Sequence, residues 1–164
     1  KREHIRRLLI RAAQQKTIPI VNYNDPVSDE ENRKMELAIR RSHGDQVVEC
    51  VDNDETAAVI ANLVHAKKLV LMTSTEGIYR DPADPKTLVE QVTAKSMEEL
   101  EEKVRQLQES CVGASRAGAN GAKAKLEYAL KSARQGTMVI IGHARHRLSD
   151  LVEGRVACTR IGLE

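Results

Sequence analysis

The chain has 164 residues, of which 41% are hydrophobic and 30% are charged, and its formal net charge is only +2. This length suffices for one hydrophobic core, so we expect a single domain over residues 1–164. The balanced charge argues against a dedicated nucleic-acid binder, and polar residues interrupt the longest apolar stretch, Val59–Met72, so that it cannot span a membrane.

The first part of the chain predicts alternating helices and strands. Ile5, Leu8, Leu9 and Ala12 recur at helical spacing, which places an apolar face on the first helix. The expected elements are a helix over 3–15, a strand over 17–22, a helix over 28–42, a strand over 46–51 and a helix from 53 to about 66. Residues 26–45 separate two strands and form either a lid or insertion, or an ordinary surface helix.

The second part continues the alternation. Ser96 and Glu99 have the spacing of a capping box at the start of a helix, and Gly136 is placed as a helix C-cap. The expected elements are strands over 68–73 and 88–92, helices over 96–109 and 121–135, a strand over 137–141, a helical turn over 149–153 and a strand over 155–161. A loop is expected over 74–85.

This alternation indicates an α/β fold, a three-layer αβα sandwich with a mainly parallel sheet and right-handed crossovers. Trp and Phe are absent, so the core is aliphatic, as in parallel sheets that helices cover. Cys50, Cys111 and Cys158 have no metal-ligand spacing, and no secretory signal precedes them. We therefore expect reduced thiols and a cytoplasmic location.

Clusters of short polar residues follow three of the expected strands: Asn22–Asp25, Asp52–Asp54 and Thr73–Thr75. Turn and cap propensities explain any one cluster equally well. All three lie where ligands bind in open α/β sheets, at the carboxyl ends of the strands. Together they indicate a site for a small polar substrate and, with water, for Mg²⁺.

A small-residue loop, Gly118–Lys125, leads into the helix expected from Gly121. Its backbone N–H groups and lysines suit phosphate oxygens, although it lacks the ending of a Walker A motif. A glycine-containing loop with two solvated lysines is the simpler reading of this segment alone. His143 and His146 form no metal motif, and a solvated basic loop explains them best.

These clusters, in this order, resemble glutamate 5-kinases of the amino acid kinase family. Those enzymes carry Pro-Val-Ile-Asn-Glu-Asn-Asp, Gly-Asp-Asn-Asp, and Ala-Asp-Lys-Leu-Leu-Leu-Leu-Thr-Asp followed by Gly-Leu-Tyr and Asp-Pro. The corresponding segments here are Pro19–Asp25, Val51–Asp54, Ala66–Ser74, Gly77–Tyr79 and Asp81–Pro82. A Gly-rich loop ending in lysine and the final Asp-x-x-Glu-Gly segment, here Asp150–Gly154, complete the resemblance, which spans nearly the whole chain.

The resemblance implies a carbamate kinase-like fold, incomplete at the N-terminus, with ATP and Mg²⁺ as cofactors and no metal site made of protein ligands alone. The implied substrate-binding residues are Asn22, Asp25, Asp52 and Asn53. The implied nucleotide-binding residues are Thr73, Ser74, Tyr79, Gly118, Ala119, Asn120, Gly121, Lys123 and Lys125. Lys125 would also be catalytic, because it would offset charge on the transferred phosphoryl group.

The implied reaction is phosphorylation of the γ-carboxylate of L-glutamate to glutamyl 5-phosphate, a step of proline biosynthesis. Acetylglutamate, aspartate, uridylate and isopentenyl phosphate kinases are alternatives within the family. A non-catalytic nucleotide- or amino-acid-binding module is an alternative of another class, because the family's first strand and Gly-Ser loop are absent and Ser74, Asn120 and Ala122 replace its Asp, Gly and Met. A third is a structural fragment whose partner completes the site. We expect a homo-oligomer, or packing against a missing N-terminal half.

Overall fold

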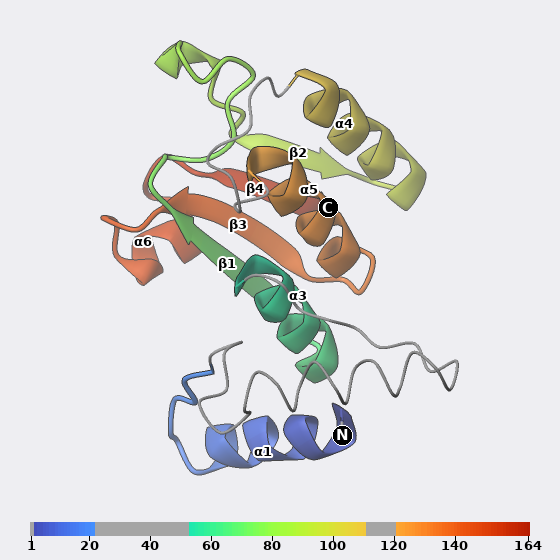
Figure 1. Ribbon diagram of the computed structural model, residues 1–164, viewed down its shortest axis with the longest axis vertical. Helices are drawn as coiled ribbons and strands as arrows, with labels where there is room; N and C mark the ends of the chain where they lie inside the picture. The colour runs from blue at the N-terminus through green and yellow to red at the C-terminus, as the bar shows by residue number, and fades with distance from the viewer. Residues whose placement is uncertain (1, 22–52, 111–120) are drawn as a thin grey trace, which may run out of the picture.

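The computed structural model describes residues 2–21, 53–110 and 121–164 (Figure 1). The expected helix over 28–42, the expected strand over 46–51 and the segment 26–45 lie outside the described residues. None of the helices in the described ranges is both long and apolar enough to cross a membrane.

The described strands form one mixed, mainly parallel sheet with the order β1-β3-β4-β2. The strands are β1 (Lys68–Thr73), β2 (Gln91–Ala94), β3 (Met138–His143) and β4 (Thr159–Leu163). β1 pairs in parallel with β3, and β2 in parallel with β4, whereas β3 and β4 are antiparallel. The expected parallel character is therefore confirmed, with a reversal of direction in the middle of the sheet.

Helices cover both faces of the sheet, which confirms the three-layer arrangement (Figure 1). The helices are α1 (Arg2–Gln14), α3 (Asn53–Val64), α4 (Met97–Ser110), α5 (Gly121–Ala133) and α6 (Leu148–Glu153). Leu71 and Ile141 point into the core formed with α3, α4 and α5. Ile140, next along β3, packs with Leu151 of α6 on the opposite face. This alternation follows from the two-residue period of a strand and explains why the central positions of β1 and β3 are apolar on both faces.

Local sequence signals explain where several helices begin and end. The Ser96 Oγ accepts a hydrogen bond from the Glu99 backbone N–H at 3.2 Å, as expected of a helix cap. Gly136, three residues after the end of α5 at Ala133, has a φ of +79°, a conformation that favours glycine. It turns the chain tightly from α5 into β3.

The expected strand over 17–22 is wrong for residues 17–21, which form no regular structure. Ile18 and Ile20 are 91% and 96% exposed. The β-branched residues there favour a strand only if a neighbouring strand pairs with them, and Pro19 has no N–H to donate.

The expected strands over 88–92 and 155–161 exist, but each lies a few residues later, as β2 and β4. Leu88 instead makes an isolated bridge with Tyr79. The register of each strand is set by its partner, and hydrophobicity along one segment does not reveal that partner.

Candidate functional site at the carboxyl ends of β1 and β3

The N-terminal ends of α3 and α5 lie at the edge of the sheet where β1 and β3 end. A short connection joins α3 to β1, and another joins α5 to β3. Figure 1 shows both N-terminal ends on the side to which the arrowheads of β1 and β3 point. Backbone N–H groups at a helix N-terminus have no intrahelical partner and carry partial positive charge, so this edge favours an anion.

An ion pair joins these two helix ends. The Lys125 Nζ of α5 contacts the Asp54 Oδ2 of α3, and 22% and 23% of the two side chains are exposed. Asp54 lies in the first turn of α3, where the helix dipole favours a carboxylate. The pair therefore holds a lysine ammonium in one position between two helix N-termini.

The strand ends supply the second part of the site. Thr73 of β1 lies opposite His143 of β3, and its carbonyl accepts a 2.9 Å hydrogen bond from the Ala144 N–H. Ser74 follows and is exposed, while Tyr79 is half-buried and forms the bridge to Leu88. The polar ends of β1 and β3 are therefore adjacent, as the clustering of their sequences predicted.

A charged cluster connects the loops that follow β1 and β3. Glu76, whose side chain is 17% exposed, contacts the Arg145 guanidinium through Oε1 and the His146 Nε2 at 2.6 Å through Oε2. The loop that carries His146 is exposed at Ala144, Arg145 and Arg147, as expected, but His146 itself is half-buried against Glu76, seventy residues earlier in the chain. In the sequence, this cluster was indicated only by the charged residues that follow β1 and β3.

A hydrogen bond to β4 also holds the loop after β1. The buried Thr159 Oγ1 accepts a 2.8 Å hydrogen bond from the Ile78 N–H. The Thr75 Oγ1 donates to the Gly77 carbonyl at 3.0 Å. These contacts hold the segment between Ser74 and Tyr79 in place beside the strand ends.

Part of the predicted site can be placed. The structure puts Asn53 and Lys125 at the two helix ends, Gly121 at the start of α5 with a φ of +59°, Lys123 exposed on the same helix, and Thr73, Ser74 and Tyr79 on β1 and its loop. The remaining predicted residues, Asn22, Asp25, Asp52, Gly118, Ala119 and Asn120, lie outside the described residues. Sequence reasoning selected Lys125 but missed Asp54 as its partner.

The sequence of this chain is similar to those of several kinases. The sequence model of the amino acid kinase family matches residues 1–143. Glutamate 5-kinase of Geobacillus kaustophilus is 33% identical over 149 residues, covering 89% of this chain and 34% of that protein. The corresponding enzyme of Gloeobacter violaceus is 32% identical over 149 residues, covering 90% and 35%. This chain therefore spans roughly a third of the length of these relatives.

Two further similarities are more limited. Acetylglutamate kinase of Methanopyrus kandleri is 46% identical over 59 residues, or 36% of this chain and 24% of that protein. The carbamate kinase from Giardia lamblia, solved with AMP-PNP bound, superposes with a TM-score of 0.52 at 21% identity. That superposition covers 71% of this chain and 34% of the carbamate kinase, and it supports the expected carbamate kinase-like fold.

Proposed function

This chain belongs to the amino acid kinase family, and on that premise we propose that it binds ATP and serves in the phosphorylation of a carboxylate. The acceptor we propose is the γ-carboxylate of L-glutamate, with glutamyl 5-phosphate as the product, a step of proline biosynthesis. The similarity to two glutamate 5-kinases over about nine-tenths of the chain supports this acceptor.

The contact between Lys125 and Asp54 is the observation that carries the proposal. A lysine that is to offset charge on a transferred phosphoryl group must be held where that charge develops. Asp54 restrains the flexible lysine side chain before the nucleotide arrives. The phosphates would then take up the remaining ammonium donors, and the N-terminal N–H groups of α3 and α5 would add further stabilisation.

Transfer of a phosphoryl group needs mainly positioning and electrostatic stabilisation. We propose that Thr73, Ser74 and Tyr79 position the nucleotide along the loop after β1, while Lys123 and Lys125 face its phosphates. The acceptor carboxylate would attack the γ-phosphorus directly, and ADP would leave with the electrons of the broken P–O bond. No covalent intermediate on the protein is required.

The acceptor would bind on the α3 side of the site. Asn53 is the first residue of α3 and is exposed, so its side-chain amide is accessible to a substrate carboxylate beside Lys125. Asn22, Asp25 and Asp52 complete the proposed substrate set. Amide and carboxylate groups together suit an amino acid, which carries both a carboxylate and an ammonium group.

Mg²⁺ would reach the site together with the nucleotide. Within residues 2–21, 53–110 and 121–164, no group of three or more His, Cys, Asp or Glu side chains is arranged to hold a metal ion. Mg²⁺ usually keeps several waters and binds substrate phosphates with one or two carboxylates. When bound, the ion would neutralise charge on the phosphate oxygens.

Calorimetric titration with Mg-ATP, together with an assay of glutamate-dependent ADP release, tests the proposal. Lys125→Ala removes a charge-assisted contact of about 1.5–3 kcal/mol, so ATP binding should weaken roughly tenfold to a hundredfold. Lys131→Ala is the matched control: Lys131 is on the same helix but near its other end, paired with Glu127. This control should change affinity by no more than about twofold.

Several outcomes separate the parts of the proposal. If ATP does not bind, or binds Lys125→Ala as tightly as the unaltered chain, the proposed nucleotide site is wrong. If ATP binds through Lys125 but no acceptor is phosphorylated, the chain is a nucleotide-binding module and the catalytic part is wrong. Asp54→Asn should reduce turnover more than ATP affinity, because the lysine would keep its charge and lose its restraint.

A further inference from the structure

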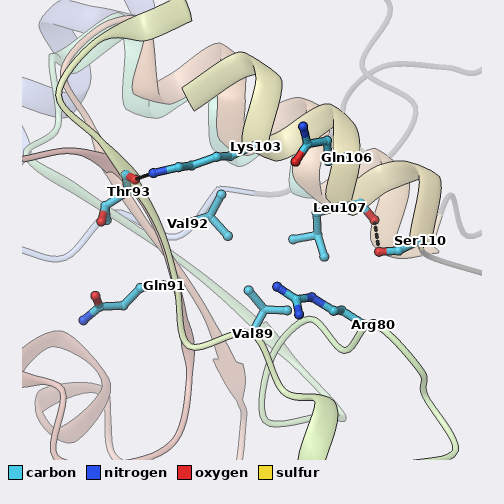
Figure 2. Close-up of a pocket in the computed structure, with 9 residues that line it drawn as sticks. All are labelled: Arg80, Val89, Gln91, Val92, Thr93, Lys103, Gln106, Leu107 and Ser110. Atoms are coloured by element: carbon cyan, nitrogen blue, oxygen red, sulfur yellow. Dashed lines mark hydrogen bonds between the residues drawn. The ribbon is translucent and has the colours of Figure 1, made fainter. Parts of the chain in front are cut away.

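A cavity of about 500 Å³ lies between β2, α4 and the loop that follows β1 (Figure 2). This volume falls within the usual range for small-molecule sites. The cavity is lined by Arg80, Val89, Gln91, Val92, Thr93, Lys103, Gln106, Leu107 and Ser110. Neither Lys125 nor Asp54 is among these residues, so the cavity is distinct from the pair that carries the proposed function.

β2, the last strand of the described sheet, forms one wall of the cavity. β2 pairs with β4, the only neighbour it has among the described strands, and Figure 2 shows the Val92 side chain pointing from β2 to the side of Leu107 and Val89. Figure 2 shows the Gln91 and Thr93 side chains turned away from Arg80. Lys103 of α4 donates a 2.8 Å hydrogen bond to the Thr93 carbonyl and holds α4 over the strand edge.

The charge of the lining favours an anionic ligand. None of the nine lining residues is acidic, whereas Arg80 and Lys103 are cationic. Lys103 is already engaged by Glu99 at 2.7 Å. The Arg80 guanidinium has no ion pair or hydrogen bond with any residue in the described part of the chain, so its paired donors remain available for a carboxylate.

The apolar side chains define the rest of the ligand. Val92 and Leu107 are 4% and 6% exposed, and Figure 2 shows Arg80 extending from its loop toward Val89 and Leu107. A ligand carboxylate on Arg80 would therefore place an attached hydrocarbon group against these three side chains. Removing that group from water contributes to binding in proportion to the apolar area buried.

The α4 side of the cavity, formed by Gln106 and Ser110, disfavours a second negative charge. The Gln106 amide N–H already bonds the Glu102 carboxylate at 2.8 Å, and the Ser110 hydroxyl donates to the Leu107 carbonyl. The Ser110 hydroxyl therefore presents only an oxygen acceptor, and the second N–H of the Gln106 amide lies beside the Glu102 carboxylate, which disfavours another anion there. A ligand with one carboxylate and an apolar body fits these constraints better than a dicarboxylate or a phosphate.

We infer that this cavity is a second binding site, which takes a small amphipathic monocarboxylate anchored by Arg80. The inference does not depend on the proposed kinase function, because the two sites share no residue. The probe is 2-naphthoate, a rigid apolar body with one carboxylate, and its uncharged twin is 2-naphthamide. Binding is followed by NMR of the methyl groups of Val89, Val92 and Leu107.

The naphthoate should shift these methyl signals in a saturable way, and Arg80→Gln should weaken its binding roughly tenfold or more. Arg80→Lys keeps the charge but loses the paired donors, so its affinity for the naphthoate should lie between those of the unaltered chain and of Arg80→Gln. Arg134→Gln is the matched control, since Arg134 lies outside the lining and pairs with Glu101 of α4, which contacts no lining residue in the described hydrogen bonds. It should bind like the unaltered chain.

Four results would overturn the inference: no saturable shift of these methyl groups, equal binding of the naphthamide, unchanged binding by a folded Arg80→Gln variant, or displacement of the naphthoate by ATP. The last would make the cavity part of the nucleotide site. Arg80 is exposed, so its replacements should remain folded, which circular dichroism verifies.

Discussion

Replacing Gly77 with alanine would test how tightly the loop after β1 is held at the site. Gly77 is buried, and its φ is not positive, so its backbone conformation is open to any residue. The constraint is steric. A Cβ added there would lie 2.4 Å from the Thr159 Oγ1, 2.9 Å from the Thr159 N and 3.1 Å from the Leu88 Cδ1.

The cost of this methyl group follows from what it meets. Thr159 is fully buried in β4 and cannot move without shifting the sheet. Forcing an extra methyl into a packed core costs about 1–3 kcal/mol. If the loop lifts away instead, the clash is relieved, but the buried Ile78 N–H loses its 2.8 Å hydrogen bond to Thr159, which also costs about 1–3 kcal/mol. Because the molecule adopts the cheaper of these two responses, the expected loss is about 1–3 kcal/mol of unfolding free energy.

Urea unfolding followed by far-UV circular dichroism measures this loss. Gly136 is the matched control, because its φ is +79° and nothing lies within 4 Å of an added Cβ. Gly136→Ala should cost about 1–2 kcal/mol from conformation alone, and Gly136→Asn should cost less because asparagine tolerates this conformation. Asparagine at position 77 should bring no such relief. A loss below about 0.5 kcal/mol for Gly77→Ala would refute the steric reasoning.

Three further changes test other contacts. Glu76→Gln removes the carboxylate that joins Arg145 and His146 and should lower the unfolding free energy by about 1–2 kcal/mol. An unchanged urea midpoint would show that this cluster does not stabilise the fold. Ser96→Ala removes the cap of α4 and should cost about 1 kcal/mol, whereas Ser96→Asp should restore most of it. The Ser132 hydroxyl is buried without a hydrogen-bond partner in the described part of the chain, so Ser132→Ala should leave thermal stability unchanged or raise it, and a loss above about 1 kcal/mol would contradict that description.

The sequence alone was enough to locate the elements whose signals are local. The helical spacing of apolar residues identified α1, and the capping spacing of Ser96 and Glu99 marked the start of α4. The apolar runs within them identified β1 and β3, since strands covered on both faces carry apolar side chains at consecutive central positions. These signals arise among residues a few positions apart, so they can be read without knowing the rest of the fold.

Tertiary structure decided which segments meet. Parallel pairing with β4 determined which residues form β2. The antiparallel pairing of β3 with β4 means that β2 and β4 run in the opposite direction to β1 and β3. The same holds for the site: sequence singled out Lys125, but only folding showed that Asp54 restrains it and that Glu76 binds His146. Each of these side chains has several possible partners of opposite charge. The choice among them depends on how helices and strands far apart in the chain pack together, and that packing free energy is not a property of any one segment.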